Sequence, residues 1–370
     1  MTKQPSLFQP KILSLFSGCG GLDLGFHMAG YETIWANDFS PFACQTFRKN
    51  IGDVIIEGDI EQIDPNDKNI PDCDIILGGF PCQDFSMIWK QPGLNGERGN
   101  LYKSFLRFVN AKKPKVFVAE NVKGLLTANK KKAIQQIITD FENCGYFVSA
   151  KLYNFAEFGV PQFRERVLIV GIRLDTGFDF QHPMPTHTSS DKVSGSLKPY
   201  CTAGQAMQNI PAWAKNQELL NISEKTRKML ELIPEGGNFT DIPPEHPLYV
   251  KGMISHVYRR MHRDEPSKTI IAAGGGGTWG YHYPEPRPFT NRERARLQSF
   301  PDDFEFIGST TEVRRQIGNA VPPLGVVEVA KALLPIFTGS YKKVDLHEKL
   351  AQEKAILFDK RLSTIRGGKK

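Results

Sequence analysis

The sequence predicts an α/β fold, with a doubly wound and mostly parallel sheet and a second, smaller, loop-rich domain. Over the first 170 residues, short apolar runs alternate with longer segments of helical spacing. This alternation is typical of parallel strands joined by helices that cover both faces of the sheet. From about residue 176 to 289 the chain is instead rich in Pro, Gly, Ser, Thr, Asn and His, which predicts a separate unit made largely of loops.

Six apolar runs are predicted to be strands of the sheet. They span residues 11–16, 32–36, 54–57, 74–77, 115–119 and 167–171. Helices are expected near residues 21–29, 103–109 and 133–138, where apolar side chains recur at helical spacing. Two more are expected at 292–299 and 324–334, and proline suits the first turn of the latter. This last helix is apolar on most of its face, so we expect it to pack on the first domain.

These patterns divide the chain into four regions. Residues 1–175 form the sheet domain, 176–289 the smaller domain, 290–340 a segment that returns to the sheet domain, and 341–370 a basic C-terminal tail. The tail carries Lys360, Arg361 and Arg366 and is expected to be a frayed, solvated end.

Composition narrows the class of protein. The 370 residues are 40% hydrophobic, which is enough for a sizeable core, and no uninterrupted apolar run approaches a membrane span of roughly 20 residues. The six cysteines show no CxxC spacing and the N-terminus lacks a secretory signal, so we expect a reduced, cytoplasmic protein with no metal site. A formal net charge of +7 permits a polyanionic partner.

A glycine-rich turn follows the first strand, at residues 16–21. Glycines there let the backbone turn sharply and approach a ligand at the start of a helix. Asp38 lies 20 residues past Gly18, where a carboxylate binds ribose hydroxyls, and Asp59 follows the third strand, where it is placed to hold an adenine amino group. The three strand ends together predict a ligand with a ribose and an adenine.

A single cysteine, Cys82, stands directly after Pro81 beyond the fourth strand. A thiol at this edge of a parallel sheet is a candidate nucleophile, and Gly78 and Gly79 remove side chains that would block a substrate. Glu120 ends the fifth strand in the same way and is a candidate acid. The alternatives are a buried structural thiol and a solvated strand-end carboxylate.

Two further clusters carry polar side chains. Gln162, Arg164 and Arg166 alternate, so in an extended segment they share one face, where two guanidinium groups can clamp a phosphate or a carbonyl oxygen. Solvated arginines are the alternative. Residues 315–323 contain a polar Gly-Asn turn before an apolar helix; this turn either begins the helix or completes the ligand pocket.

Together these clusters resemble the cytosine-5 DNA methyltransferase family, in particular the methylases of bacterial type II restriction–modification systems. The resemblance covers about residues 11–175 and 290–335, and the motifs occur in the family's order. They are residues 16–21, 79–83, 120–122, 162–166, 296–301 and 318–322. The resemblance implies a Rossmann-like methyltransferase domain that uses S-adenosyl-L-methionine, with residues 176–289 as the target-recognition domain.

The resemblance also implies roles for individual residues. Catalysis falls to Cys82, Glu120, Arg164 and Arg166, with the thiolate adding to carbon 6 of a flipped-out cytosine. The cofactor is held by Phe16, Gly18, Gly20, Asp38, Phe39, Asp59, Ile60, Leu101, Asn319 and Val321. Contacts with double-stranded DNA fall to Gln83, Ser86, Gln162, Lys268 and Thr269. The enzyme is expected to be a monomer that works alongside a restriction endonuclease.

Three other functions remain open at this point. One branch of the same family methylates tRNA with the same Pro-Cys motif, although the long segment 176–289 favours DNA. A nicotinamide oxidoreductase would explain the glycine turn and Asp38 but would leave Cys82 and Glu120 without a role. A catalytically inactive DNA-binding relative would not need those two residues either.

Overall fold

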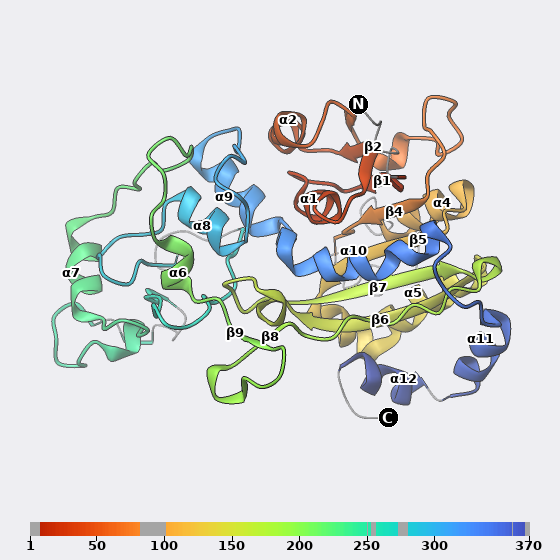
Figure 1. Cartoon of the computed structure of the whole chain (residues 1–370). Coiled ribbons are helices and arrows are strands. Elements are labelled where there is room, and N and C mark those ends of the chain that lie inside the picture. Colours follow the sequence, from red (N-terminus) through yellow and green to blue (C-terminus); the bar gives the residue numbers. More distant parts are fainter. Residues whose placement is uncertain are drawn as a thin grey trace, which may run out of the picture.

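The structure is a computed structural model that describes residues 8–81, 101–249, 251–252, 257–272, 280–356 and 358–366. It has a larger lobe built on a β-sheet and a smaller lobe of short helices and loops (Figure 1). Within the described ranges the sheet has seven strands in the order β3-β2-β1-β4-β5-β7-β6.

The strands of this sheet are β1 (Lys11–Leu15), β2 (Glu32–Asp38), β3 (Ile55–Glu57), β4 (Ile75–Gly78), β5 (Val116–Val122), β6 (Tyr146–Asn154) and β7 (Glu165–Arg173). The first five strands are parallel to one another, whereas β7 runs antiparallel between β5 and β6. The predicted mostly parallel sheet is therefore confirmed, and all six predicted strands are present. Strand β6 was not anticipated.

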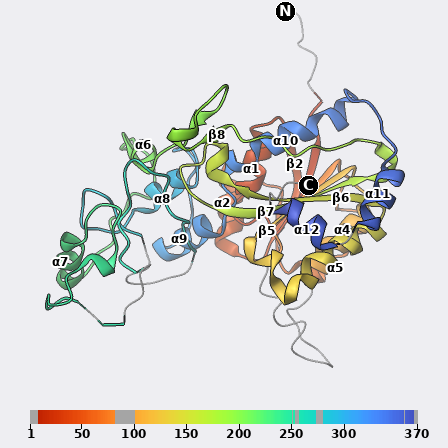
Figure 2. The same ribbon diagram turned by 90° about the horizontal axis from the view of Figure 1, so that it is seen from below.

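Helices cover both faces of the sheet, because its central strands are apolar on both sides. On one face α4 (Leu101–Lys112) and α5 (Lys132–Asn143) pack on Leu13, Ile76 and Phe117. On the other face α1 (Gly21–His27) and α10 (Pro323–Thr338) pack on Ile12 and Val118. Figure 2 shows α10 and α5 on opposite sides of β6 and β7. The expectation that the apolar helix near residues 324–334 returns to the sheet domain agrees with this packing.

The stretch Thr310–Thr338 is long and apolar enough for a membrane span by composition alone, with a mean hydropathy of 1.6. Two thirds of that apolar window is buried inside the protein. The stretch also divides into α9 (Thr310–Asn319) and α10, since Ala320 and Pro322 adopt extended conformations between them. Its apolar character is explained by the core of the larger lobe.

The smaller lobe contains α6 (Ala203–Met207), α7 (Glu224–Leu232), α8 (Asn291–Leu297) and α9, and a two-stranded sheet of β8 (His187–Thr188) and β9 (Lys198–Pro199) lies at its border with the larger lobe (Figure 1). Helix α8 packs on both α6 and α9. Their shared core includes Met207, Phe289, Leu297 and Ile317. Residues on both sides of position 290 therefore form one packed unit, and of the segment 290–340 it is α10 that lies on the sheet.

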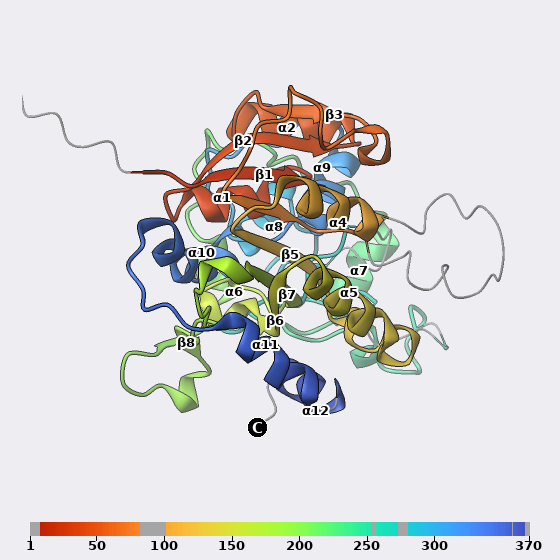
Figure 3. The same cartoon turned by 90° about the vertical axis from the view of Figure 1, so that its right-hand side faces the viewer.

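The expectation of a frayed C-terminal tail is wrong for residues 346–366. These residues form α11 (Leu346–Ala355) and α12 (Phe358–Ile365), which contact β6 at the end of the sheet opposite β3 (Figure 3). Leu362 and Ile365 are buried in the core of the larger lobe, and Arg361 Nη2 lies 2.7 Å from Oε1 of the buried Glu142. Apolar residues at helical spacing give these helices a buried face, which the basic composition of the tail conceals.

Candidate active site

The glycine-rich turn after β1 has the backbone that its sequence predicts. Phe16, Gly18 and Gly20 all have positive φ angles, of 53°, 54° and 89°. Gly18 donates its backbone N–H to Asp38 Oδ2 over 2.8 Å, which ties the end of β1 to the end of β2. Among the described residues other than Gly18 and its two chain neighbours, no atom lies within 4 Å of the position that a Cβ on Gly18 would occupy. The turn therefore presents an open backbone face beside Asp38.

Asp38 is a nearly buried carboxylate held by backbone donors. Its second oxygen accepts the N–H of Ser40 over 2.9 Å. Burial raises the pKa of Asp38, and the hydrogen bonds from Ser40 and Gly18 oppose that shift. The next residue, Phe39, is 76% exposed. An adenosine-like ligand would cover the exposed aromatic ring of Phe39 and contact the desolvated carboxylate of Asp38.

The other predicted cofactor residues lie at neighbouring strand and helix ends. Asp59 caps a short 3-10 helix by accepting the N–H of Glu61 over 2.9 Å, and Ile60 is buried below it. Leu101 begins α4 and is half-buried. Asn319 ends α9 with an exposed side chain.

Val321 closes this group against the start of α1. A Cβ on Gly21 would lie 2.4 Å from the carbonyl oxygen of Val321. The absence of a side chain at Gly21 therefore lets the segment 319–321 lie directly on the glycine turn. The structure brings together the first and last of the predicted cofactor motifs, which are 300 positions apart in the sequence.

Glu120 ends up in an ion pair with Arg166. Arg166 Nε lies 2.8 Å from Glu120 Oε1, with the two side chains 14% and 13% exposed. Burial raises the pKa of Glu120, whereas the positive charges of Arg166 and Arg164 oppose that shift. The pairing follows from the register of β5 and β7, in which Arg166 faces Val122 and lies diagonally from Glu120.

The backbone that leads to Cys82 is fixed beside Glu120. Asn121 is buried and its Nδ2 donates to the carbonyl oxygen of Phe80 over 2.9 Å. A Cβ on Gly79 would lie 3.1 Å from Glu120 Oε2. The predicted residues Cys82, Gln83 and Ser86 lie outside the described residues, and the last described residue before them is Pro81. The chain therefore leaves β4 alongside the Glu120 carboxylate.

Gln162 lies in the interior and not on a DNA-facing surface. Its Nε2 donates to Leu297 O over 3.1 Å and to Gln298 Oε1 over 2.9 Å, and its Oε1 accepts the N–H of Ile270. The side chain has no exposed area. The predicted DNA contact of Gln162 does not fit this position, because every polar atom of the amide is directed at protein partners.

Arg164 is also buried, with 1% of its surface exposed. Its guanidinium donates to the carbonyl oxygens of Ile270, Gly318 and Ala320 over 2.9–3.1 Å. Burial lowers the pKa of Arg164 to about 9, and the neighbouring Arg166 adds to the effect. Its geometry is that of a residue that holds the segment around Asn319 in place, and its bonded N–H groups are not directed at a substrate.

Lys268 and Thr269 lie on the smaller lobe against the segment before β7. Thr269 Oγ1 donates to Phe163 O over 2.8 Å, and Lys268 Nζ lies 5.3 Å from the centre of the Phe163 ring. Both residues are exposed, and both line a hollow of about 1020 Å³. Lys268 and Thr269 therefore remain predicted DNA contacts, and the charge of Lys268 is exposed.

Gln298 also belongs to this site, although the sequence motif alone does not distinguish it from its neighbours. Its Nε2 donates to the carbonyl oxygens of Ile317 and Ala320. It therefore joins the Gln162 amide to the same loop that Arg164 holds. The available signal was its place between Leu297 and Phe300 in the motif at 296–301.

The comparison with known families decides the class of this arrangement. The profile of the C-5 cytosine-specific DNA methylases matches residues 10–334. The chain belongs to this family. The type II methyltransferase M.NgoFVII of Neisseria gonorrhoeae is 84% identical over 361 residues, covering 98% of this chain and 96% of that protein. M.BbvI of Brevibacillus brevis is 43% identical and covers 87% and 90% of the two chains.

Solved structures agree on the fold. A putative DNA modification methyltransferase encoded within an Escherichia coli prophage superposes with a TM-score of 0.69 at 20% identity, covering 89% of this chain and all of that chain. The Schizosaccharomyces pombe Dnmt2 methyltransferase gives a TM-score of 0.63 at 18% identity, covering 89% and 99%. This C-5 cytosine DNA methyltransferase is of the type II restriction–modification kind. The nicotinamide and tRNA alternatives are not supported.

Proposed function

We propose that this DNA methylase transfers the methyl group of S-adenosyl-L-methionine to carbon 5 of a flipped-out cytosine within a specific double-stranded sequence. The observation that carries the proposal is the Glu120–Arg166 pair, which lies beside the backbone segment that leads to Cys82. An acid and a nucleophile at the ends of adjacent strands are the two groups that this chemistry needs.

Cys82 is the proposed nucleophile. Its thiolate forms a bond to carbon 6 of cytosine, and the electrons of the 5,6 double bond make carbon 5 nucleophilic. A proton from Glu120 to N3 takes up the charge that would otherwise build on the ring. After methylation, loss of the carbon-5 proton to a base restores the double bond and expels the thiolate.

The surroundings of Glu120 favour its proposed role as the proton donor to N3. Burial raises its pKa, so its protonated form persists nearer to neutral pH than that of a solvated glutamate. The ion pair with Arg166 fixes one oxygen, and Gly79 leaves backbone without a side chain next to the other oxygen. We assign Arg166 to orient this carboxyl group, and Arg164 to position the segment 318–320 behind it.

The residues around the glycine turn fit S-adenosyl-L-methionine, which supplies the methyl group when bound. Gly18 offers an open backbone face, Asp38 is placed for ribose hydroxyls and Phe39 for one face of the adenine. Asp59 would accept from the adenine amino group. The remaining members of this pocket would be Phe16, Gly20, Ile60, Leu101, Asn319 and Val321.

Target choice is assigned to residues 176–289. Lys268 and Thr269 belong to the proposed DNA surface, as do Gln83 and Ser86. Because carbon 6 is shielded in a duplex, the cytosine must leave the stack, at a cost of a few kcal/mol. A chimera carrying the 176–289 segment of another member should methylate that member's target, and a chimera that keeps the original target would contradict this assignment.

The proposed setting is a monomeric, cytoplasmic enzyme whose partner in function is a restriction endonuclease. Methylation of the shared target would protect the DNA of the cell. The high similarity to named type II methyltransferases supports this setting.

The test uses tritiated S-adenosyl-L-methionine with the full chain and its Cys82→Ser variant, on unmodified duplex DNA and on tRNA. We expect label in 5-methylcytosine of DNA that disappears with the variant. Label in tRNA alone would move the enzyme to the RNA branch. Label in DNA that survives Cys82→Ser would remove Cys82 from its assigned role.

A further inference from the structure

Arg294 on α8 is a buried cation without a counterion among the described residues. It is 1% exposed, and neither its Nε nor its Nη2 has a hydrogen-bond partner. Its guanidinium lies 5.6 Å from the centre of the Phe289 ring. Burial lowers the pKa of Arg294 to about 9, and the charge of Arg314 adds to the effect. A desolvated charge in this state is costly unless an anion reaches it.

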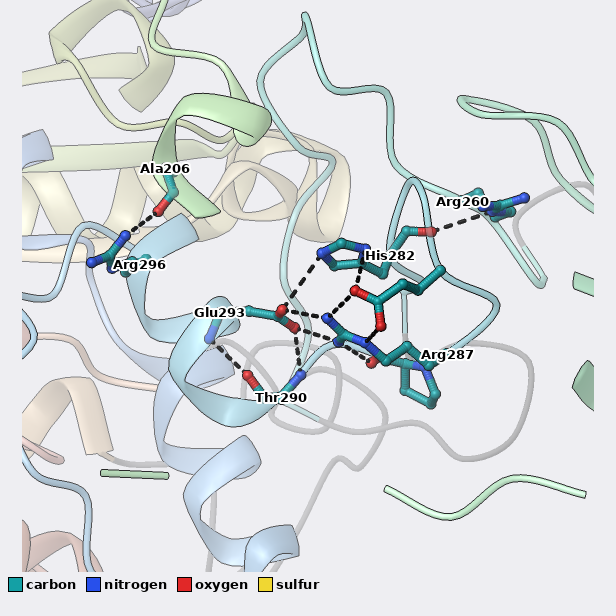
Figure 4. Close-up of polar contacts among 9 residues, drawn as sticks. Ala206, Arg260, His282, Arg287, Thr290, Glu293 and Arg296 are labelled. Atoms are coloured by element: carbon teal, nitrogen blue, oxygen red, sulfur yellow. Dashed lines mark hydrogen bonds and ion pairs between the residues drawn. The ribbon is translucent and has the colours of Figure 1, made fainter. Parts of the chain in front are cut away.

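The acid next to Arg294 in the sequence is already engaged elsewhere. Glu293 accepts two hydrogen bonds from Arg287, at 2.8 and 2.9 Å, and a third from the backbone N–H of Thr290 (Figure 4). His282 Nε2 lies 3.5 Å from the same carboxylate. Arg287 pairs with Glu285 as well. Arg287 therefore has two carboxylates in contact, while Arg294 has none within the described parts of the chain.

Arg294 lines the same hollow of about 1020 Å³ as Lys268. Basic side chains predominate among the charged residues that line it. The acidic residue there is Glu265, and the basic ones are Arg259, Arg260, His262, Lys268 and Arg294. Arg260 is committed to backbone carbonyls of the smaller lobe, including those of Leu230 and Ile233. Ser267, also in the lining, has a buried hydroxyl without a partner in the described chain.

We propose that this hollow binds a backbone phosphate of the DNA substrate, with Arg294 as its principal donor and Ser267 as a second donor. Two unpaired N–H groups on one guanidinium match two phosphate oxygens, and a phosphate supplies the negative charge that a buried cation needs. A base edge would supply hydrogen-bond acceptors without that charge. Such a contact fixes the position of the duplex on the smaller lobe and carries no sequence information.

The test compares Arg294→Met with Arg227→Met, which removes an exposed arginine from α7 in the same lobe. Binding of the full chain to a random-sequence 30-base-pair duplex is followed by fluorescence anisotropy between 50 and 200 mM salt. For Arg294→Met we expect about tenfold weaker binding and a salt slope smaller by about 0.9, the value for one lost phosphate contact. Arg227→Met should leave the slope unchanged.

Two further measurements separate this role from a structural one. Arg294→Met should unfold at a temperature no lower than the parent chain, because it removes a buried unpaired charge. Arg294→Lys should keep the salt slope and lose part of the affinity. Lysine keeps the positive charge but lacks the planar guanidinium that can bind two phosphate oxygens at once.

Three results would overturn the proposal. One is an unchanged slope and affinity in Arg294→Met, and another is a fall in its unfolding temperature. The third is an unchanged slope together with a loss of specificity at one base pair of the methylated target, as mapped by bisulfite sequencing. That last result would make Arg294 a reader of a base.

Discussion

Glu120 and Arg166 lie on adjacent antiparallel strands and meet through a single ion pair, with 2.8 Å between Oε1 and Nε. A purely parallel sheet would not produce this diagonal pairing, because it depends on β7 running against β5. The reversal of one strand therefore supplies the partner that holds the proposed acid. Burial and charge act on Glu120 in opposite directions, and burial is the larger effect.

Replacing Glu120 by Gln should abolish most of the methyl transfer while leaving the fold intact. The amide oxygen can still accept from Arg166, but the side chain loses the proton that the cytosine N3 requires. We expect the single-turnover rate to fall at least about a hundredfold. Glu165→Gln is the control, since Glu165 is an exposed carboxylate on the same strand as Arg166 and pairs with Lys123. An activity of Glu120→Gln within a few-fold of the parent would remove Glu120 from catalysis.

Gly18→Ala should weaken cofactor binding much more than it weakens the fold. Its φ of 54° strains any other residue by about 1 kcal/mol, and the new methyl group would enter the open face beside Asp38. Calorimetric titration should show a cofactor Kd at least tenfold higher. Gly30→Ala is a matched control, because Gly30 has a φ of 93° and equally open surroundings outside the glycine turn. Equal cofactor affinities in the two variants would contradict the assigned pocket.

The sequence predicted most of the fold because apolar runs and helical spacing are local properties. Strand β6 was not predicted because it lies at the edge of the sheet. Polar residues such as Ser149, Lys151 and Asn154 interrupt its apolar pattern there. The direction of β7 could not be predicted, since a buried strand has the same apolar pattern whether it pairs in parallel or antiparallel. The C-terminal helices were not predicted because the charged composition of the tail suggested a solvated end. Leu362 and Ile365 nevertheless have the spacing of a buried helix face.

The site was predicted less completely, for a physical reason that Arg164 illustrates. Its three carbonyl partners are 106 to 156 positions away in the sequence, so their approach depends on the whole fold. The arginine side chain indicated a functional position, but the sequence did not show that Arg164 is buried. The position of Asp38 beside the glycine turn follows more directly from the sequence, because its partner Gly18 lies one β–α–β unit away and the geometry of that unit is general.

Gly318→Ala should disrupt the contact between α9 and the segment 271–272 within the smaller lobe. A Cβ at this position would lie 2.2 Å from the backbone nitrogen of Ala272, so α9 and the segment 271–272 would have to separate. We expect the free energy of unfolding to fall by about 2 kcal/mol or more, with weaker binding of both cofactor and DNA. Gly124→Ala is the control, since the nearest atom to its Cβ would be at 3.8 Å. Denaturant unfolding that matches the parent chain would show that these backbones are not in contact in solution.

Asp23 should make the protein less stable as the pH rises. It is a fully buried residue of the first turn of α1 and accepts hydrogen bonds from Ser14 Oγ and Thr33 Oγ1, both at 2.9 Å. Burial raises its pKa to about 6, so the folded protein binds a proton that the unfolded chain has already released. This contribution to stability is complete below the pKa of the unfolded chain, near 3.8, and is lost as the pH rises through 6.

Asp23→Asn removes this dependence and keeps the shape of the side chain. Denaturant unfolding at pH 4.5 and 7.5 should show the variant gaining about 2 kcal/mol relative to the parent chain at the higher pH. All other carboxylates are common to both proteins, so the difference between the two curves isolates Asp23. A difference that is the same at both pH values would mean that Asp23 is ionised in the folded protein throughout this range. The hydroxyls of Ser14 and Thr33 would then be the groups that compensate its buried charge.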